Sequence, residues 1–169
     1  EPLAARGWLK EKDLFLPYEA NSGFINFDRV RTFKKEILEK AFRAFRAQGA
    51  ANADYRAFCE KEAYWLEDYA LFHAAKKEYG GAAWTEWDAA IKRRDPDALR
   101  ALRERQRDAM ELDYFKQYIF HTQWNRLHDY ARAKGIEILG DMPIFIAQDS
   151  ADVWAHQHLF DLNEDGTPH

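Results

Sequence analysis

The spacing of apolar residues constrains this chain most, because it keeps a helical period over residues 28–134. In the first part of that range, apolar side chains recur every three or four residues, which marks one face of an amphipathic helix. We expect this helix to be capped by Asp28 and to end at Gly49. The apolar positions that define its buried face are Val30, Phe33, Ile37, Leu38, Ala41, Phe42 and Phe45.

Further helices are predicted downstream of this one. A second helix is expected over residues 53–79, and a short one follows Thr85. Aspartate caps helices and proline suits their first turn, so Asp95 and Pro96 predict the start of a long helix over 96–134. A helix of this length invites a bend or a break, which we place near Met110.

The period changes after Gly135, which is expected to end the long helix. Residues 136–140 form a short run rich in β-branched residues, typical of a strand buried on both faces in an α/β fold. Asp141 follows this strand at its carboxyl end. In (β/α)₈ barrels the active site lies at that end, so Asp141 would point toward it. The alternative is that Asp141 caps a turn or bonds loop backbone.

The last segment, residues 150–169, predicts a capped helical turn, an irregular loop and a possible hairpin at Asp165 and Gly166. The strand within residues 136–146 has no second strand in the sequence to pair with, and an unpaired edge is a liability. We therefore expect these residues to be poorly ordered, paired with another copy, or folded onto the helices.

Composition excludes several classes of protein. A chain of 169 residues with 47% hydrophobic residues can bury the core of one domain. Its 25 basic and 29 acidic side chains are interspersed, so no nucleic-acid surface is predicted. No apolar run approaches the roughly 18 residues of a membrane span. The single cysteine, Cys59, excludes an internal disulfide, is expected to be a buried inert thiol, and fits a cytoplasmic location.

Neither a metal nor a cofactor is predicted. His156 and His158 are one residue apart, a spacing at which both could reach a metal only on a strand. No cysteine lies nearby, so a zinc site is not expected. His121 and His128 are interpreted as packing or surface residues of the long helix.

Residues 140–154 closely resemble a signature of the amylomaltase (4-alpha-glucanotransferase) family, whose pattern is G-D-[LM]-P-I-[YF]-[VI]-A-x-D-S-[AV]-[DE]-V-W. Gln148 stands where that family frequently has an acidic residue or histidine. Further similarities cover the rest of the chain. They are Gly7-Trp8-Leu9, the W-L-x-D-Y-A-L-F segment at 65–72, the W-x-x-W element at 84–87, the F-x-x-Q-W element at 120–124, and the Leu-Phe pair and acidic glycine turn at 159–166.

The resemblance implies a retaining (β/α)₈ TIM-barrel enzyme that transfers α-1,4-glucan segments between malto-oligosaccharides. It also implies that this chain is an internal fragment, mainly α-helical with one short β-strand. Residues 1–27 would be a loop-rich opening segment, 28–134 a helical insertion subdomain, and 135–169 a barrel strand with the active-site loop that follows it. The chain begins without methionine and stops soon after Gly166, which also favours a fragment.

The family's R-x-D-H and A-E-D-L-G motifs, which carry its catalytic residues, are absent, so we expect no catalytic residue in this chain. The resemblance assigns Asp141 to substrate binding, because the matching aspartate bonds the glucose ring at the cleavage point. Trp154 and Asp149 are further substrate-binding candidates. The alternatives are that Trp154 anchors the loop and that Asp149 and Ser150 cap the short helix.

A different class of function also fits the aromatic residues. The chain could be a non-catalytic helical module that binds carbohydrate or acts as a scaffold. In the carbohydrate-binding form of this hypothesis, a tryptophan would stack on glucan, the candidates being Trp84, Trp87, Trp124 and Trp154. The sequence predicts no particular oligomeric state.

Overall fold

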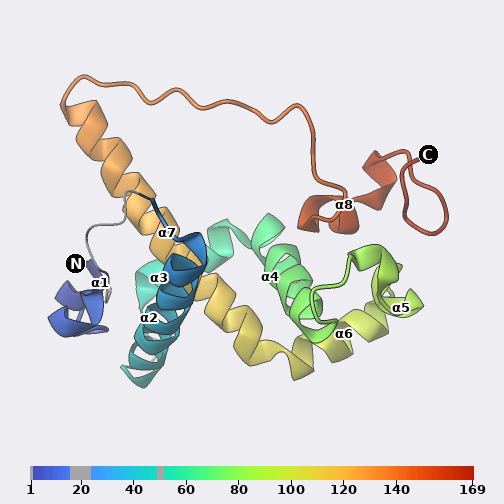
Figure 1. Ribbon diagram of the computed structural model, residues 1–169, viewed down its shortest axis with the longest axis horizontal. Helices are drawn as coiled ribbons and strands as arrows, with labels where there is room; N and C mark the ends of the chain where they lie inside the picture. Colours follow the sequence, from blue (N-terminus) through green and yellow to red (C-terminus); the bar gives the residue numbers. More distant parts are fainter. Residues whose placement is uncertain (1, 16–23, 49–51) are drawn as a thin grey trace. The chain divides into compact units, whose positions relative to one another are not determined.

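The computed structural model describes residues 2–15, 24–48 and 52–169 (Figure 1). Helices and one isolated bridge account for the regular secondary structure in these ranges. The chain divides into two compact units, Glu1–Arg56 and Ala57–His169, which are described separately below. The mainly helical fold class expected from the sequence is therefore confirmed for the described residues.

The first unit is organised around one long helix. Its elements are α1 (Pro2–Ala5), the 3₁₀ turn η1 (Glu11–Leu14), α2 (Phe27–Ala47) and the beginning of α3 (Ala53–Lys61). Asn26, not Asp28, caps α2, and its side-chain oxygen accepts the Arg29 backbone N–H at 3.1 Å. Asparagine and aspartate cap equally well, so the sequence alone could not separate the two positions. Gly49, the expected end of this helix, lies outside the described residues.

The core of the first unit joins its opening segment to α2. The Trp8 ring meets Phe45 edge-on, with ring centroids 5.3 Å apart. The Trp8 indole N–H donates to the Gln48 side-chain oxygen at 2.8 Å, so the buried indole is satisfied. Phe45 also contacts Tyr55, at 5.0 Å between centroids. The segment expected to be a loop-rich opening thus includes short helical turns that are fastened to α2.

The second unit contains the remaining helices. In chain order they are α4 (Ala63–Glu78), η2 (Trp84–Glu86), α5 (Ala89–Lys92), α6 (Pro96–Arg105), α7 (Arg107–Ala133), α8 (Ala151–Ala155) and η3 (Gln157–Leu159). Asp95 caps α6 as predicted, because its Oδ1 accepts the backbone N–H groups of Asp97 and Ala98 at 3.1 and 3.0 Å. Pro96 occupies the first turn.

One helix predicted as continuous is broken, and a second breaks close to the position expected for its bend or break. The helix expected over 53–79 turns at Glu62, whose side chain accepts the Trp65 indole N–H at 2.7 Å. The helix expected over 96–134 turns at Gln106, a little before the predicted bend at Met110. Gln106 donates its side-chain amide to Glu78 at 2.5 Å, a contact with the end of α4 that no local sequence pattern reports.

Aromatic rings fill the core of the second unit. Phe72 of α4, Trp87 and Trp154 of α8 form a triangle whose ring centroids lie 5.3 to 6.0 Å apart. Residues that pack around this triangle include Ala70, Leu71, Ala74, Ala75, Trp84, Ile91, Leu99, Leu102, Met110 and Val153. The short helix α8 is therefore held on α4 by burial of its tryptophan and valine.

The predicted strand after Gly135 is absent from the structure. Gly135 has a φ of 70° and ends α7 as expected, with the Ile136 N–H bonded to the Ala131 carbonyl at 3.0 Å. Residues 136–149 then form neither helix nor strand, and Leu139 and Ile144 are each 90% exposed. The strand prediction is wrong for this chain because a strand needs a neighbour to complete its ladder, and the described residues supply none.

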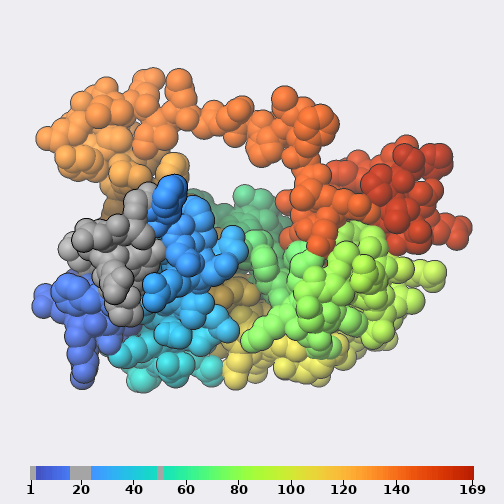
Figure 2. Space-filling view, viewed as in Figure 1, coloured from blue at the N-terminus to red at the C-terminus, as the bar shows by residue number. Residues whose placement is uncertain are grey.

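The same segment is not folded onto the helices, which was one of the arrangements expected for it. Figure 2 shows it in orange as an extended length of chain that runs from the end of α7 to α8, and most of its large apolar side chains are exposed. Two expectations from composition can be compared with the described residues. In these ranges, no helix is long and apolar enough to cross a membrane.

Cys59, expected to be buried, is half-buried on α3.

Candidate functional site

Asp141 lies in the middle of the exposed segment between α7 and α8. Its side chain makes no hydrogen bond or ion pair with any residue that the structure describes. The alternative in which Asp141 caps a turn or bonds loop backbone is therefore not what this structure contains. Both carboxylate oxygens remain open to hydroxyl donors, as a sugar-binding role requires.

The chain beyond Asp141 is fastened to the helical core through Gln148 and Asp149. The Trp84 indole N–H donates to the Gln148 carbonyl at 2.8 Å, and the Trp84 backbone N–H donates to Asp149 Oδ1 at 3.3 Å. Lys76 of α4 forms an ion pair with the other oxygen of Asp149. These contacts fix the downstream end of the segment that carries Asp141.

Ser150 caps α8, and Asp149 does not. The Ser150 hydroxyl accepts the Val153 backbone N–H at 3.3 Å, as the sequence predicted for the pair of residues at this position. Asp149 uses both of its oxygens on Lys76 and Trp84. A sugar hydroxyl would have to compete with an ion pair for the Asp149 carboxylate.

Trp154 is fully buried, at 0% exposure. Its indole N–H donates to the Ile91 carbonyl at 3.1 Å, and the Arg94 guanidinium lies 4.4 Å from its ring centroid. Stacking on a sugar would require this ring to leave the core. The geometry instead favours the alternative stated for Trp154, in which it anchors the loop.

Arg94 joins α8 to α4. Its Nη2 donates to Asp68 Oδ1 at 2.6 Å while its plane covers Trp154. Arg94 is the non-glycine residue with a positive φ, 59°, in the described ranges, and its Nη1 is buried there without a hydrogen-bond partner. Both features cost stability, so the ion pair and the cation–π contact must offset them.

The turn near the C-terminus packs on the same tryptophan that holds the segment. Asp165 and Gly166 form the expected turn, which is closed by a single antiparallel bridge between Leu162 and Pro168. The Gln148 side-chain amide donates to the Gly166 carbonyl at 3.1 Å. A carboxylate could not donate this bond, so glutamine has a structural use at a position where the family often has another residue.

The tryptophans of the carbohydrate-binding hypothesis differ in accessibility. Trp84 and Trp87 are buried, at 0% and 3% exposure, as is Trp154. Trp124 is 43% exposed and stacks on Phe120, with centroids 6.4 Å apart. Three of the four candidate rings therefore belong to the core and offer no face to a glucan.

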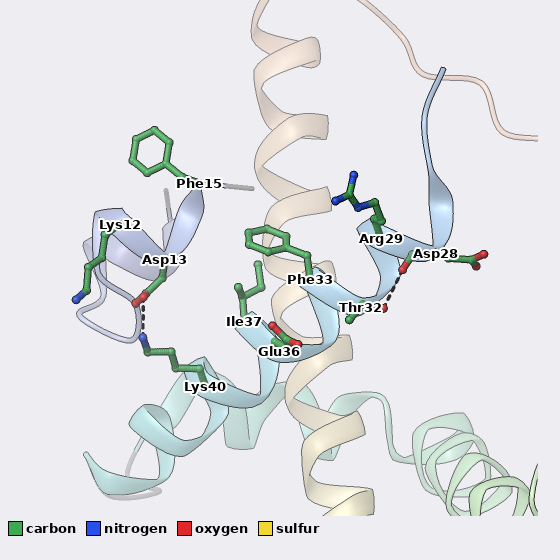
Figure 3. A pocket seen from close by; sticks show the side chains of 10 residues that line it. All are labelled: Lys12, Asp13, Phe15, Asp28, Arg29, Thr32, Phe33, Glu36, Ile37 and Lys40. Atoms are coloured by element: carbon green, nitrogen blue, oxygen red, sulfur yellow. Dashed lines mark hydrogen bonds and ion pairs between the residues drawn. The ribbon is translucent and has the colours of Figure 1, made fainter. Parts of the chain in front are cut away.

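The first unit contains a cleft of about 620 Å³ beside α2 (Figure 3). Figure 3 shows Lys40 pointing to Asp13, and these side chains are 2.6 Å apart. The hydrogen bond from Lys40 lowers the pKa of Asp13 below its ordinary value. The lining residues are Lys12, Asp13, Phe15, Asp28, Arg29, Thr32, Phe33, Glu36, Ile37 and Lys40, none of which was predicted as a site residue.

The described residues contain no group of histidine, cysteine and carboxylate side chains arranged to hold a metal ion. The rings of His156 and His158 lie edge to face, 6.2 Å apart between centroids, and His158 belongs to the 3₁₀ turn η3. The strand on which both could reach one metal is not formed.

Comparisons with known proteins place these features in a family. A family model described as 4-alpha-glucanotransferase matches residues 1–168. The 4-alpha-glucanotransferase of Thermus thermophilus is 40% identical over 169 residues, and that of Aquifex aeolicus (strain VF5) is 38% identical over 168 residues. Each alignment covers 99% of this chain and 33% of the relative.

A solved structure is similar over nearly the whole chain. It is described as the amylomaltase from Streptococcus agalactiae in complex with acarbose, with a TM-score of 0.89 and 32% sequence identity. The match covers 98% of this chain and 34% of that one. The chain thus spans about a third of the length of the relatives it matches.

Proposed function

The chain belongs to the family of 4-alpha-glucanotransferases, and we propose that it is one part of an enzyme that transfers α-1,4-glucan segments between malto-oligosaccharides. The observation that carries this proposal is the family match over residues 1–168, which includes the complete signature around Asp141. The open carboxylate of Asp141 supports it, because that group is free to bind sugar hydroxyls.

In the proposed reaction, the chemistry is divided between this chain and residues outside it. A carboxylate nucleophile attacks the anomeric carbon while a carboxylic acid protonates the departing glycosidic oxygen. The resulting carboxylate then takes the proton of an incoming sugar hydroxyl, which displaces the enzyme from the anomeric carbon. Asp141 would hold the glucose ring at the cleavage point through its hydroxyls, and the two reacting carboxyl groups would come from beyond this chain.

The proposal also gives residues 136–140 a place in the enzyme. They would form a strand of a (β/α)₈ barrel, with Asp141 at its carboxyl end facing the active site. Residues 28–134 would be a helical insertion that precedes this strand. A cytoplasmic location is part of the proposal, because a chain with one cysteine needs no oxidising compartment.

A chimera tests the proposal. The matching third of the Thermus thermophilus 4-alpha-glucanotransferase would be replaced by this chain, and glucose release and longer products would be measured with maltotriose. We expect the chimera to transfer glucosyl units and this chain alone to be inactive. Asp141→Asn should lower the chimera's kcat/KM by about 10–100-fold, since one or two hydrogen bonds to a charged group are weakened.

Two results would contradict the proposal. A folded chimera in which Asp141→Asn transfers as well as the parent would remove Asp141 from the substrate site. Turnover of maltotriose by this chain alone would show that the reacting carboxyl groups are within it. Glu137→Gln is the matched control, because it neutralises a neighbouring exposed carboxylate that the proposal assigns no role.

A further inference from the structure

A second cleft, of about 380 Å³, lies at the surface of the second unit between α4 and α8. This volume falls in the lower part of the range of about 300–1,000 Å³ usual for ligand sites. Its lining residues are Tyr64, Trp65, Asp68 and Tyr69 of α4 with Ala151, Asp152 and Ala155 of α8 and His156, which follows α8 as its C-cap. The family signature assigns none of the α4 residues to the reaction, and Asp141 is not among them.

The spacing of small and large side chains creates this cleft. Ala151 and Ala155 are four residues apart on α8, so their methyl groups fall on one face of the helix. The facing wall carries bulky rings, and Trp65 meets Tyr69 edge-on with centroids 5.8 Å apart. The Trp65 indole N–H is held by Glu62 at 2.7 Å, so this ring is fixed in place.

The polar groups of the cleft are available to a ligand. Asp68 gives one oxygen to Arg94 at 2.6 Å, which leaves its other oxygen able to accept. Asp152 and His156 are exposed, and neither side chain makes a hydrogen bond or ion pair with a described residue. Each follows one of the two alanines directly in the sequence, and all four residues line the cleft. Tyr64, at 79% exposure, adds an open aromatic ring.

We propose that this cleft is a second binding site for a malto-oligosaccharide, separate from the site of Asp141. A sugar ring presents C–H groups to an aromatic face and hydroxyl groups to carboxylate and imidazole acceptors, and the lining offers both. No lysine or arginine lines the cleft, and two carboxylates do, so an anionic ligand is disfavoured. The choice of an α-1,4-glucan as the sugar rests on the proposed function.

The test is a titration of the intact chain with maltoheptaose, followed by tryptophan fluorescence and by isothermal calorimetry. We expect saturable binding, reported in part by Trp65. Tyr64→Ala should raise the Kd by about tenfold, since losing the contact between an aromatic ring and the bound sugar weakens binding by a factor of that order. Asp152→Asn should raise it by a similar factor, since it weakens a hydrogen bond to a charged acceptor. Both side chains are exposed, so neither variant should lose the fold.

Matched controls separate this site from others. Tyr130→Ala removes another exposed tyrosine, at 64% exposure on α7, and should leave the Kd unchanged. Cellohexaose, a β-1,4-linked glucan, should bind more weakly than maltoheptaose. If maltoheptaose does not bind up to millimolar concentration, or binds as well to Tyr64→Ala and Asp152→Asn, the second site is refuted. Binding abolished by Asp141→Asn alone would refute it while leaving the proposed function intact.

Discussion

Replacement of Gly166 by alanine should destabilise the second unit far more than a glycine-to-alanine change at an ordinary turn. Gly166 has a φ of 88°, and a Cβ built on it would lie 2.5 Å from Trp84 Cη2 and 2.7 Å from Cζ3. Trp84 is completely buried, and its indole N–H is bonded to the Gln148 carbonyl. The ring therefore has no simple way to move aside.

The magnitude follows from two separate terms. A left-handed backbone conformation costs an L-residue about 1–2 kcal/mol. Forcing an extra methyl group into a packed core costs about 1–3 kcal/mol. Gly166→Ala should thus lower the free energy of unfolding by about 2–5 kcal/mol. Gly81 has almost the same φ, 90°, with no atom within 4 Å of its Cβ position, so Gly81→Ala should cost only the first term.

The stability of both variants can be measured by urea unfolding followed by tryptophan fluorescence. Their free energies of unfolding should be compared with one common m-value, the slope of that free energy against urea concentration. Hydrogen exchange of the Trp84 indole should accelerate in Gly166→Ala and not in Gly81→Ala, since that N–H is held by the segment that must move. Equal destabilisation by the two substitutions would show that the contact with Trp84 carries no energy, and the packing argument would fail.

Three further predictions concern other parts of the second unit. Trp154→Ala should lower the free energy of unfolding, measured by urea unfolding, by about 3–5 kcal/mol. Trp124 is half-exposed, so Trp124→Ala should lower it by much less. The hydrogen bond from Arg105 lowers the pKa of Glu78 below 4.5, so the stability it contributes is present above that pH and lost as pH falls through the folded-state pKa. In Glu78→Gln, the free energy of unfolding should therefore fall less steeply than in the parent as the pH drops below about 4.5. Backbone amides of residues 137–147 should exchange within seconds in deuterium-exchange mass spectrometry, whereas those in the middle of α7 should be protected; strong protection in a monomer would contradict the unpaired segment.

Helices could be predicted from the sequence because their determinants are local. Asp95 caps the backbone of the next two or three residues, and Gly135 ends the helix that immediately precedes it. Both signals act within a few residues of the side chain that produces them. The same locality limited the prediction at Asn26, where two capping residues lie two positions apart and only the folded chain selects one.

Contacts between residues far apart in the sequence could not be predicted from local signals. The break at Gln106 coincides with its bond to Glu78, 28 residues away. Asp149 was read as part of a helix cap, yet it contacts Lys76 and Trp84 across more than 60 residues. The second cleft was missed for the same reason, because its walls come from α4 and α8. The spacing of Ala151 and Ala155 was the only sequence signal for it, and two alanines four residues apart also occur in many helices that line no cleft.

The failed strand prediction has a different physical origin, and it bears on the role proposed for Asp141. A helix closes its backbone hydrogen bonds within itself, so its pattern is sufficient to form it. A strand closes them only on a neighbour, so the pattern of residues 136–140 describes a sheet that one segment cannot supply. Asp141 is open on this chain for the same reason that its segment is exposed. In the proposed enzyme, neighbouring strands would fix the backbone on which its carboxylate sits. Asp141→Asn should therefore leave the stability of this chain unchanged while it reduces transfer by the chimera.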